Sequence, residues 1–85
     1  VHEVVAPDQL ETQAMALASE LANGPQVAMR MLKRSILQAA ELSWEQSLDE
    51  IAAKTAFCDH HPDAREGVLA FKEKRAPRFN AWLED

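Results

Sequence analysis

Apolar residues recur at helical spacing along most of the chain, between short breaks that contain proline or polar residues. In residues 8–22 they fall at positions i, i+4, i+7, i+8, i+11 and i+12, which lie on one face of a helix: Leu10, Ala14, Leu17, Ala18, Leu21 and Ala22. Similar stripes run through residues 25–40, 44–58 and 62–75. The pattern predicts four helices with about these bounds.

Residues at the breaks support these bounds. Asp8 is expected to cap the first helix, and Asn23-Gly24 to end it. Ser43, followed three residues later by Gln46, is a capping-box pattern for the third helix. We therefore expect an all-α protein of about four short helices joined by short loops, forming one helical domain over residues 1–85.

The first residues have a different character. Val1, Val4 and Val5 are β-branched, which is typical of strands, and we expect them to be a short strand remnant that has lost its pairing partners. The sequence does not begin with methionine, and its first residues show no basic segment followed by an apolar core, so no signal peptide is expected. The simplest interpretation is a fragment whose natural start lies upstream.

Composition narrows the possible functions. The net charge of −5 disfavours a nucleic-acid partner, because phosphate binding needs an excess of cations. One cysteine excludes an internal disulfide. No apolar run approaches the roughly 18 residues of a membrane span, so no membrane partner is expected. Taken together, the charge, the single cysteine and the absence of a long apolar run point to a cytoplasmic helical protein. The second helix and residues 72–78 nevertheless each carry a net charge of +3, so either could bind an anion.

Potential metal ligands gather at Cys58-Asp59-His60-His61. A structural zinc site normally needs a second ligand cluster, and the sequence offers none, so we expect no metal. A carboxylate pair at Asp63 and Glu66 falls in the first turns of the fourth helix, where the helix dipole favours negative charge. The simpler interpretation is that these two acids start the helix.

The last quarter of the chain is the most informative. Gly67 is costly inside a helix, so it is expected to permit a close backbone approach. Phe71 and Lys74 lie three residues apart, and Arg75 is adjacent. An aromatic ring beside cations suits a nucleotide, because the ring stacks on the base while the cations bind phosphates. Spacing alone, however, favours Phe71 as a core residue with solvated cations around it.

Three blocks of residues resemble the C-terminal part of the enoyl-CoA hydratase/isomerase (crotonase) superfamily. The first is residues 1–5, which are similar to a strand end in that family. The second is residues 22–28 with Lys33 further on. The third is residues 63–79, which follow the family pattern D-x-x-E-G-x-x-A-F-x-E-K-R-x-P-x-F nearly throughout. The chain departs from the family at His61, where many members have the better N-caps Ser or Thr.

The resemblance implies the orthogonal helical C-terminal domain of a parent enzyme acting on acyl-CoA thioesters, most simply a hydro-lyase. It implies that Phe71 contacts the CoA adenine and Lys74 a nearby phosphate, with Arg75 as a possible further contact. No residue here corresponds to a catalytic position, so the chain alone is expected to be inactive. No cofactor is implied, since the CoA thioester is the substrate of the parent enzyme.

The resemblance also implies self-assembly, as a trimer or hexamer in the parent, and self-association of the isolated chain. An alternative from another class is a stand-alone helical protein-interaction module without CoA chemistry. Such a module would have no reason to carry Gly67, Phe71 and Lys74 together. A helix-turn-helix DNA binder is disfavoured by the acidic charge.

Overall fold

A computed structural model of the chain describes residues 1–84, most of which are helical. The helices are α1 (Leu10–Ala22), α2 (Gln26–Ala39), α3 (Trp44–Asp59) and α4 (Pro62–Glu73), with short 3-10 helices η1 (Pro7–Gln9) and η2 (Ala81–Glu84). The all-α class is confirmed, and each α-helix begins and ends within two residues of its predicted bounds.

Two expectations for the N-terminal segment are wrong. Residues 1–6 form no strand, because an isolated extended segment needs a neighbouring strand to satisfy its backbone groups and the described residues supply none. Asp8 does not cap α1: it lies inside η1, and neither η1 nor α1 has a side-chain hydrogen bond at its N-cap. The preceding Pro7 instead starts the 3-10 turn.

The starts of α3 and α4 follow local rules. The Ser43 Oγ accepts a hydrogen bond from the Gln46 amide at 3.1 Å, and the Gln46 side chain accepts one from the Ser43 amide at 3.0 Å. This confirms the capping box. His61 acts as the N-cap of α4, where its Nδ1 accepts a hydrogen bond from the Asp63 amide at 3.2 Å.

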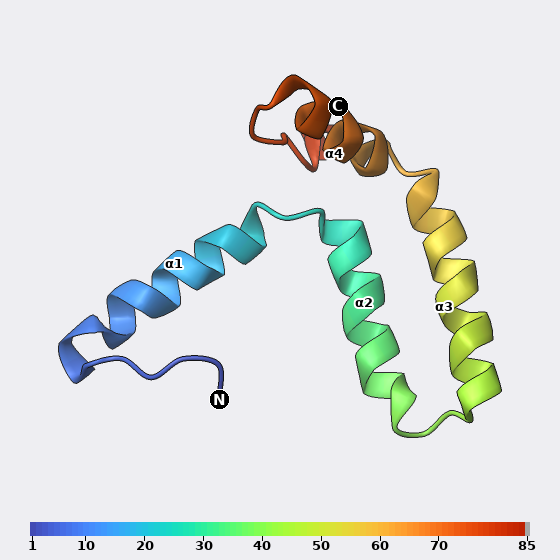
Figure 1. The fold of residues 1–85 in the computed structure, drawn as a ribbon, viewed down its shortest axis with the longest axis horizontal. Helices are drawn as coiled ribbons and strands as arrows, with labels where there is room; N and C mark the ends of the chain where they lie inside the picture. Colours follow the sequence, from blue (N-terminus) through green and yellow to red (C-terminus); the bar gives the residue numbers. More distant parts are fainter. Residues whose placement is uncertain (85) are drawn as a thin grey trace.

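The helices are arranged in an open shape. α2 and α3 lie side by side in opposite directions, and α4 follows beyond the end of α3 (Figure 1). α1 projects from the start of α2, and residues 1–5 turn back along it (Figure 1). None of the helices within residues 1–84 is long and apolar enough to cross a membrane.

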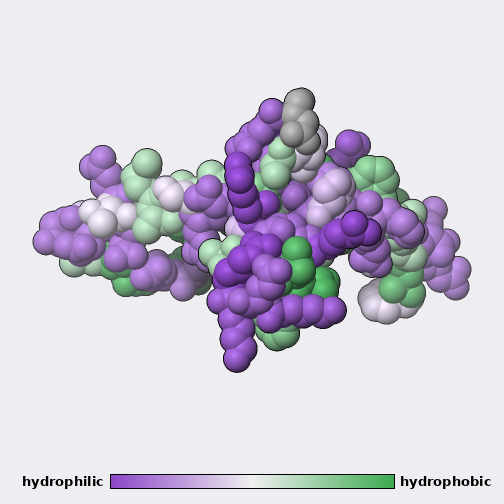
Figure 2. All heavy atoms as spheres, turned by 90° about the horizontal axis from the view of Figure 1, so that it is seen from above, coloured by the Kyte–Doolittle hydropathy of each residue, from purple (hydrophilic) through white to green (hydrophobic). Residues whose placement is uncertain are grey.

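The chain builds almost no core of its own. Of the described residues only Ala70 and Asp63 are buried. Trp44, the first residue of the apolar stripe in residues 44–58, is 77% exposed. A compact monomer of this mass would expose about 5,000 Å² and have a radius of gyration of about 12 Å. This chain exposes 7388 Å² and has a radius of gyration of 16.2 Å. Hydrophobic side chains are accordingly visible on its outer surface (Figure 2).

Candidate functional site

Phe71 lies on the last turn of α4 and points into solvent. Its side chain is 86% exposed, so the interpretation of Phe71 as a core residue does not hold within the described chain. The residue before it, Ala70, is the most buried residue described, at 1% exposed. The helix therefore packs through Ala70 and presents the aromatic ring outward.

Lys74 lies just beyond α4, which ends at Glu73 rather than at the predicted Arg75. Its backbone is left-handed, with φ 54° and ψ 43°. The Lys74 amide donates to the Phe71 carbonyl at 3.3 Å, and the Arg75 amide to the Ala70 carbonyl at 3.0 Å. These are the two bonds of a Schellman motif, in which glycine usually takes the left-handed position. A lysine there costs roughly 1–2 kcal/mol in backbone conformation.

Arg75 binds Glu66 through both terminal nitrogens of its guanidinium. Arg75 Nη1 donates to Glu66 Oε1 at 2.6 Å and Nη2 donates to Oε2 at 3.1 Å, while its Nε donates to Glu73. The Arg78 amide also donates to Glu66 Oε1, at 2.8 Å. The hydrogen bonds from Arg75 and Arg78 lower the pKa of Glu66 to about 2. Hydrogen bonds to Glu66 and Glu73 raise the pKa of Arg75.

Asp63 holds the tail that follows α4 against the start of that helix. Its side chain is buried and accepts hydrogen bonds from the Asn80 amide at 2.9 Å and from Trp82 Nε1 at 3.4 Å. The Trp82 ring packs edge-on against His61, with centroids 5.3 Å apart. Asp63 and Glu66 were predicted only to start the helix; they also fold residues 74–84 back over it.

Asn80 connects this tail to the turn between α1 and α2. Its Oδ1 accepts a hydrogen bond from the Gln26 amide at 3.0 Å, and its Nδ2 donates to the Gly24 carbonyl at 2.8 Å. Its backbone is left-handed, with φ 64°, a conformation that asparagine tolerates better than most residues. The side chain thereby satisfies an otherwise unpaired amide at the start of α2.

The close backbone approach predicted at Gly67 is not made within the described residues, where the nearest atoms belong to the Phe79 ring. A Cβ atom on Gly67 would lie 3.6 Å from Cε1 and 3.9 Å from Cζ of Phe79, which are ordinary contact distances. Phe79 belongs to the same tail as Asn80. Gly67 therefore lies under the folded-back tail, with room for a methyl group.

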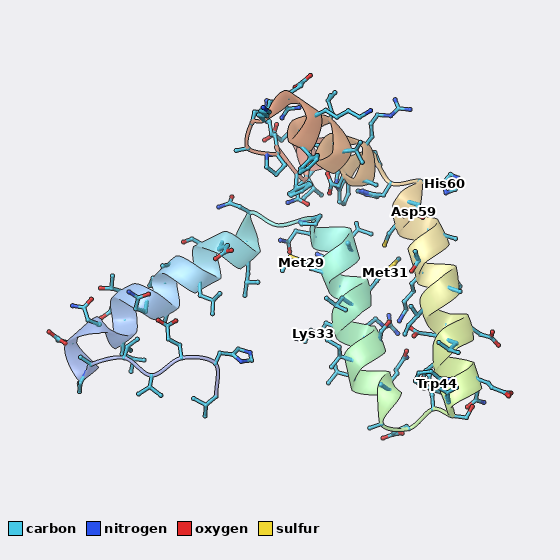
Figure 3. The ribbon with its side chains drawn as sticks, viewed as in Figure 1. Met29, Met31, Lys33, Trp44, Asp59 and His60 are labelled. Atoms are coloured by element: carbon cyan, nitrogen blue, oxygen red, sulfur yellow. The ribbon has the colours of Figure 1, made fainter. Side chains whose placement is uncertain are left out.

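The potential ligands at residues 58–61 do not converge. Cys58 Sγ contacts Met31 Sδ across α2 and α3 at 3.6 Å, and His60 Nδ1 lies 2.9 Å from the Ala56 carbonyl. Met31 points from α2 toward α3, and Asp59 and His60 lie at the C-terminal end of α3 (Figure 3). Within residues 1–84, no three His, Cys, Asp or Glu side chains are grouped so that they could hold a metal ion.

A groove of about 370 Å³ runs between α2 and α3 and is mostly apolar. Its polar members form one cluster, in which the Ser35 hydroxyl donates to Glu50 at 3.0 Å. Lys54 donates to Ser35 at 3.1 Å and pairs with Glu50. The ammonium is paired with a carboxylate, so it is unsuited to serve as a base for the Ser35 hydroxyl. The cluster fixes how the two helices face each other.

Comparison with known proteins decides the family. The model of the enoyl-CoA hydratase/isomerase family matches residues 1–81. The chain belongs to this family. The matched residues include all of α4 and the tail to Ala81. Phe71 and Lys74 therefore both lie within the part of the chain that the family model matches.

Curated members of the family show how much of an enzyme the chain represents. It is 37% identical over 81 residues to an enoyl-CoA hydratase of Mycobacterium tuberculosis, covering 93% of this chain and 31% of that protein. It is 35% identical over 83 residues to carnitinyl-CoA dehydratase of Escherichia coli O157:H7, covering 91% and 31%. The chain therefore spans about a third of the length of the curated relatives that it matches.

A solved structure of the family has the same helical arrangement. The crystal structure of an enoyl-CoA hydratase from Bacillus anthracis aligns with a TM-score of 0.82 at 30% identity, covering 89% of this chain and 30% of that one. The open arrangement of the helices is therefore similar to that of the matching segment in this longer family member.

The sequence pattern singles out Phe71, Lys74 and Arg75 as candidate site residues and gives no such indication for Asn80. The motif of residues 63–79 stops one residue before Asn80, and the partners of its side chain lie more than 50 positions away. A signal was present, since asparagine is common in turns and tolerates the left-handed conformation better than most residues. That signal predicts a turn and not the residues that the side chain contacts.

Proposed function

We propose that this chain is the C-terminal segment of an enoyl-CoA hydratase/isomerase family enzyme that acts on acyl-CoA thioesters, as a cytoplasmic hydro-lyase. In this proposal the segment completes the CoA pocket and contributes to subunit assembly. Phe71 stacks on the adenine, and the Lys74 ammonium pairs with a phosphate. Catalytic groups come from the remaining two thirds of the parent.

The observation that carries the proposal is the exposure of Phe71 beside the fixed turn at Lys74. An aromatic ring that is 86% exposed leaves a face available for a base. Lys74 is also exposed, and an ammonium group binds phosphate as a point charge. The Arg75 guanidinium is already bound to Glu66 and Glu73, so the proposal assigns the phosphate to Lys74 and not to Arg75.

A chimera tests the proposal. This chain replaces the matching segment of the enoyl-CoA hydratase from Bacillus anthracis, and hydration of crotonyl-CoA is measured. Phe71→Ala and Lys74→Ala are each expected to raise KM several-fold with kcat little changed, because both groups bind the nucleotide far from the reacting carbons. Trp44→Ala serves as the control, since it removes an exposed aromatic ring from α3. Unchanged KM in both variants would contradict the proposal.

The isolated chain does not by itself separate this proposal from the interaction-module alternative. The 85-residue chain is expected to hydrate no crotonyl-CoA, because no oxyanion-hole segment is present in its sequence. A module without CoA chemistry would be inactive as well, so the decisive comparison is the chimera. An active chimera whose KM depends on Phe71 and Lys74 has no explanation under the module alternative.

A further inference from the structure

The backbone at Lys74 is held from both sides by side-chain contacts. Glu73, before it, accepts a hydrogen bond from Arg75 Nε, and Arg75, after it, binds Glu66 with two further nitrogens. The amide of Arg78 binds the same Glu66 carboxylate at 2.8 Å. Arg75 and Arg78 are thus both anchored to a single acid, Glu66, which lies nine and twelve positions earlier in the chain.

This anchoring maintains a conformation that lysine disfavours. The left-handed position of a Schellman motif is normally occupied by glycine, and a lysine persists there only where its surroundings fix the backbone. Its side chain meanwhile stays exposed, and no ion pair engages it among the residues that the structure describes. The contacts fix the backbone and leave the ammonium available.

We propose that Glu66 and Arg75 are positioning residues that hold Lys74 in its left-handed turn and so present its ammonium to a CoA phosphate next to Phe71. This inference rests on the proposed function. A turn that is already formed spares the ligand the entropy of ordering it, and so strengthens binding without any contact from Glu66. Glu66 acts through Lys74 and touches no part of the nucleotide.

The test compares two substrates that differ only in the nucleotide. In the chimera described above, KM is measured for crotonyl-CoA and for crotonyl-pantetheine, which lacks the adenosine and its phosphates. Glu66→Gln keeps the shape of the side chain and removes its charge. It is expected to raise KM several-fold for crotonyl-CoA and to leave KM for crotonyl-pantetheine unchanged. Glu84→Gln is the matched control, because it breaks an exposed arginine pair of the same tail, at 2.8 Å from Arg78.

The outcomes separate the inference from the proposed function. If Lys74→Ala raises KM for crotonyl-CoA alone while Glu66→Gln has no effect, the inference is overturned and the proposed function stands. An equal rise for both substrates in Glu66→Gln reveals a purely structural role and also overturns the inference. If Lys74→Ala affects neither substrate, the inference is overturned, and if Phe71→Ala affects neither as well, the proposed function fails with it.

A second measurement tests the inference in case the chimera does not fold. CoA and pantetheine are titrated separately into the 85-residue chain, and the amide resonances of Phe71 and Lys74 are followed by NMR. CoA alone is expected to shift them, and Glu66→Gln is expected to weaken that response while Glu84→Gln preserves it. An undiminished response in Glu66→Gln overturns the inference.

Discussion

Gly67 offers a stabilising substitution inside α4. Glycine in a helix interior is about 1 kcal/mol less favourable than alanine, and the Phe79 ring would meet an added methyl group at 3.6 Å, an ordinary contact distance. Gly67→Ala is therefore expected to stabilise α4 by about 1 kcal/mol, equivalent to roughly fivefold slower amide exchange in that helix. Hydrogen exchange followed by NMR measures the change directly.

Gly24 provides the matched control. A Cβ atom there would lie 2.6 Å from Met29 Sδ and 3.3 Å from the Leu21 carbonyl oxygen, and the residue lies in a turn, where no helix propensity is gained. Gly24→Ala is expected to bring no stabilisation. Faster exchange in α4 of Gly67→Ala would show that Phe79 packs more tightly on the helix than the structure indicates.

Glu66 makes the attachment of the tail sensitive to acid. Its pKa in the folded chain is about 2, against an ordinary value of 4.5, because Arg75 and Arg78 donate hydrogen bonds to the carboxylate. Since the folded-state pKa is the lower one, the stabilisation is complete above about pH 4.5 and is lost as the pH falls toward 2. We expect the Arg78 amide to lose its protection from exchange in that interval.

The measurement follows the Glu66 side-chain carboxyl carbon by NMR during an acid titration, together with exchange of the Arg78 amide. In Glu66→Gln the protection factor of the Arg78 amide should no longer change with pH over this range, because the titrating group is gone. A Glu66 carboxyl that titrates near 4.5 in the wild-type chain would mean that its pairing with Arg75 is not maintained in solution.

The sequence predicts the contacts of some residues and not of others. The difference follows from how far apart along the chain the two contacting residues lie. The capping bonds of Ser43 and Gln46 span three positions, so a short pattern specifies them. Glu66 and Arg75 lie nine positions apart and meet only because the chain reverses after Lys74. A lysine in a left-handed turn has no propensity signal, so the Glu66–Arg75 pair could not be predicted from local pattern.

Among the elements, the tail depends on Asn80 for its attachment to the start of α2. Asn80→Gly keeps the left-handed backbone accessible and removes both side-chain bonds, to the Gln26 amide and to the Gly24 carbonyl. Loss of a comparable helix cap costs about 1–2 kcal/mol. The Gln26 amide is therefore expected to exchange roughly 5–30 times faster, as measured by hydrogen exchange.

Two further variants test whether the change in exchange comes from the hydrogen bonds of the Asn80 side chain. Asn80→Asp keeps an acceptor for the Gln26 amide but loses the donor to Gly24, so its effect should be intermediate. Asn23→Ala removes another asparagine whose Nδ2 donates only to the Ser19 carbonyl within α1, and it should leave Gln26 unaffected. Equal exchange of Gln26 in Asn80→Gly and in the wild-type chain would mean that the tail does not dock on α2.

The helices themselves could be predicted because their apolar period is local, whereas the placement of the tail could not. Each α-helix follows from a stripe of residues three or four positions apart. The tail is placed by Asp63, Phe79, Asn80 and Trp82 through contacts that cross 12 or more positions. Residues 1–5 show the converse case, since a strand pattern without a partner strand gives no strand.

At the scale of the whole molecule, the exposed apolar surface is the dominant property. The chain exposes 7388 Å² where a compact monomer of its mass would expose about 5,000 Å², and the groove of about 370 Å³ between α2 and α3 is lined mainly by apolar side chains. Contiguous apolar surface of this extent favours association. The helices have an arrangement similar to that in a longer relative. The apolar faces of the helices are largely exposed in this chain.

We therefore expect the 85-residue chain to self-associate, and sedimentation at a concentration of about 100 μM, generous for a weak dimer, measures it. Leu32 and Ile36 are 60% and 64% exposed and lie one turn apart on α2 beside the groove. Replacing both with glutamine should shift the distribution toward the monomer, because it removes apolar area from the contact face. Val4→Thr, outside the helices, is the control and should leave the distribution unchanged. A single species of 9.5 kDa for the wild-type chain at this concentration would show that the exposed faces do not suffice for assembly and that the rest of a family subunit must supply the contacts.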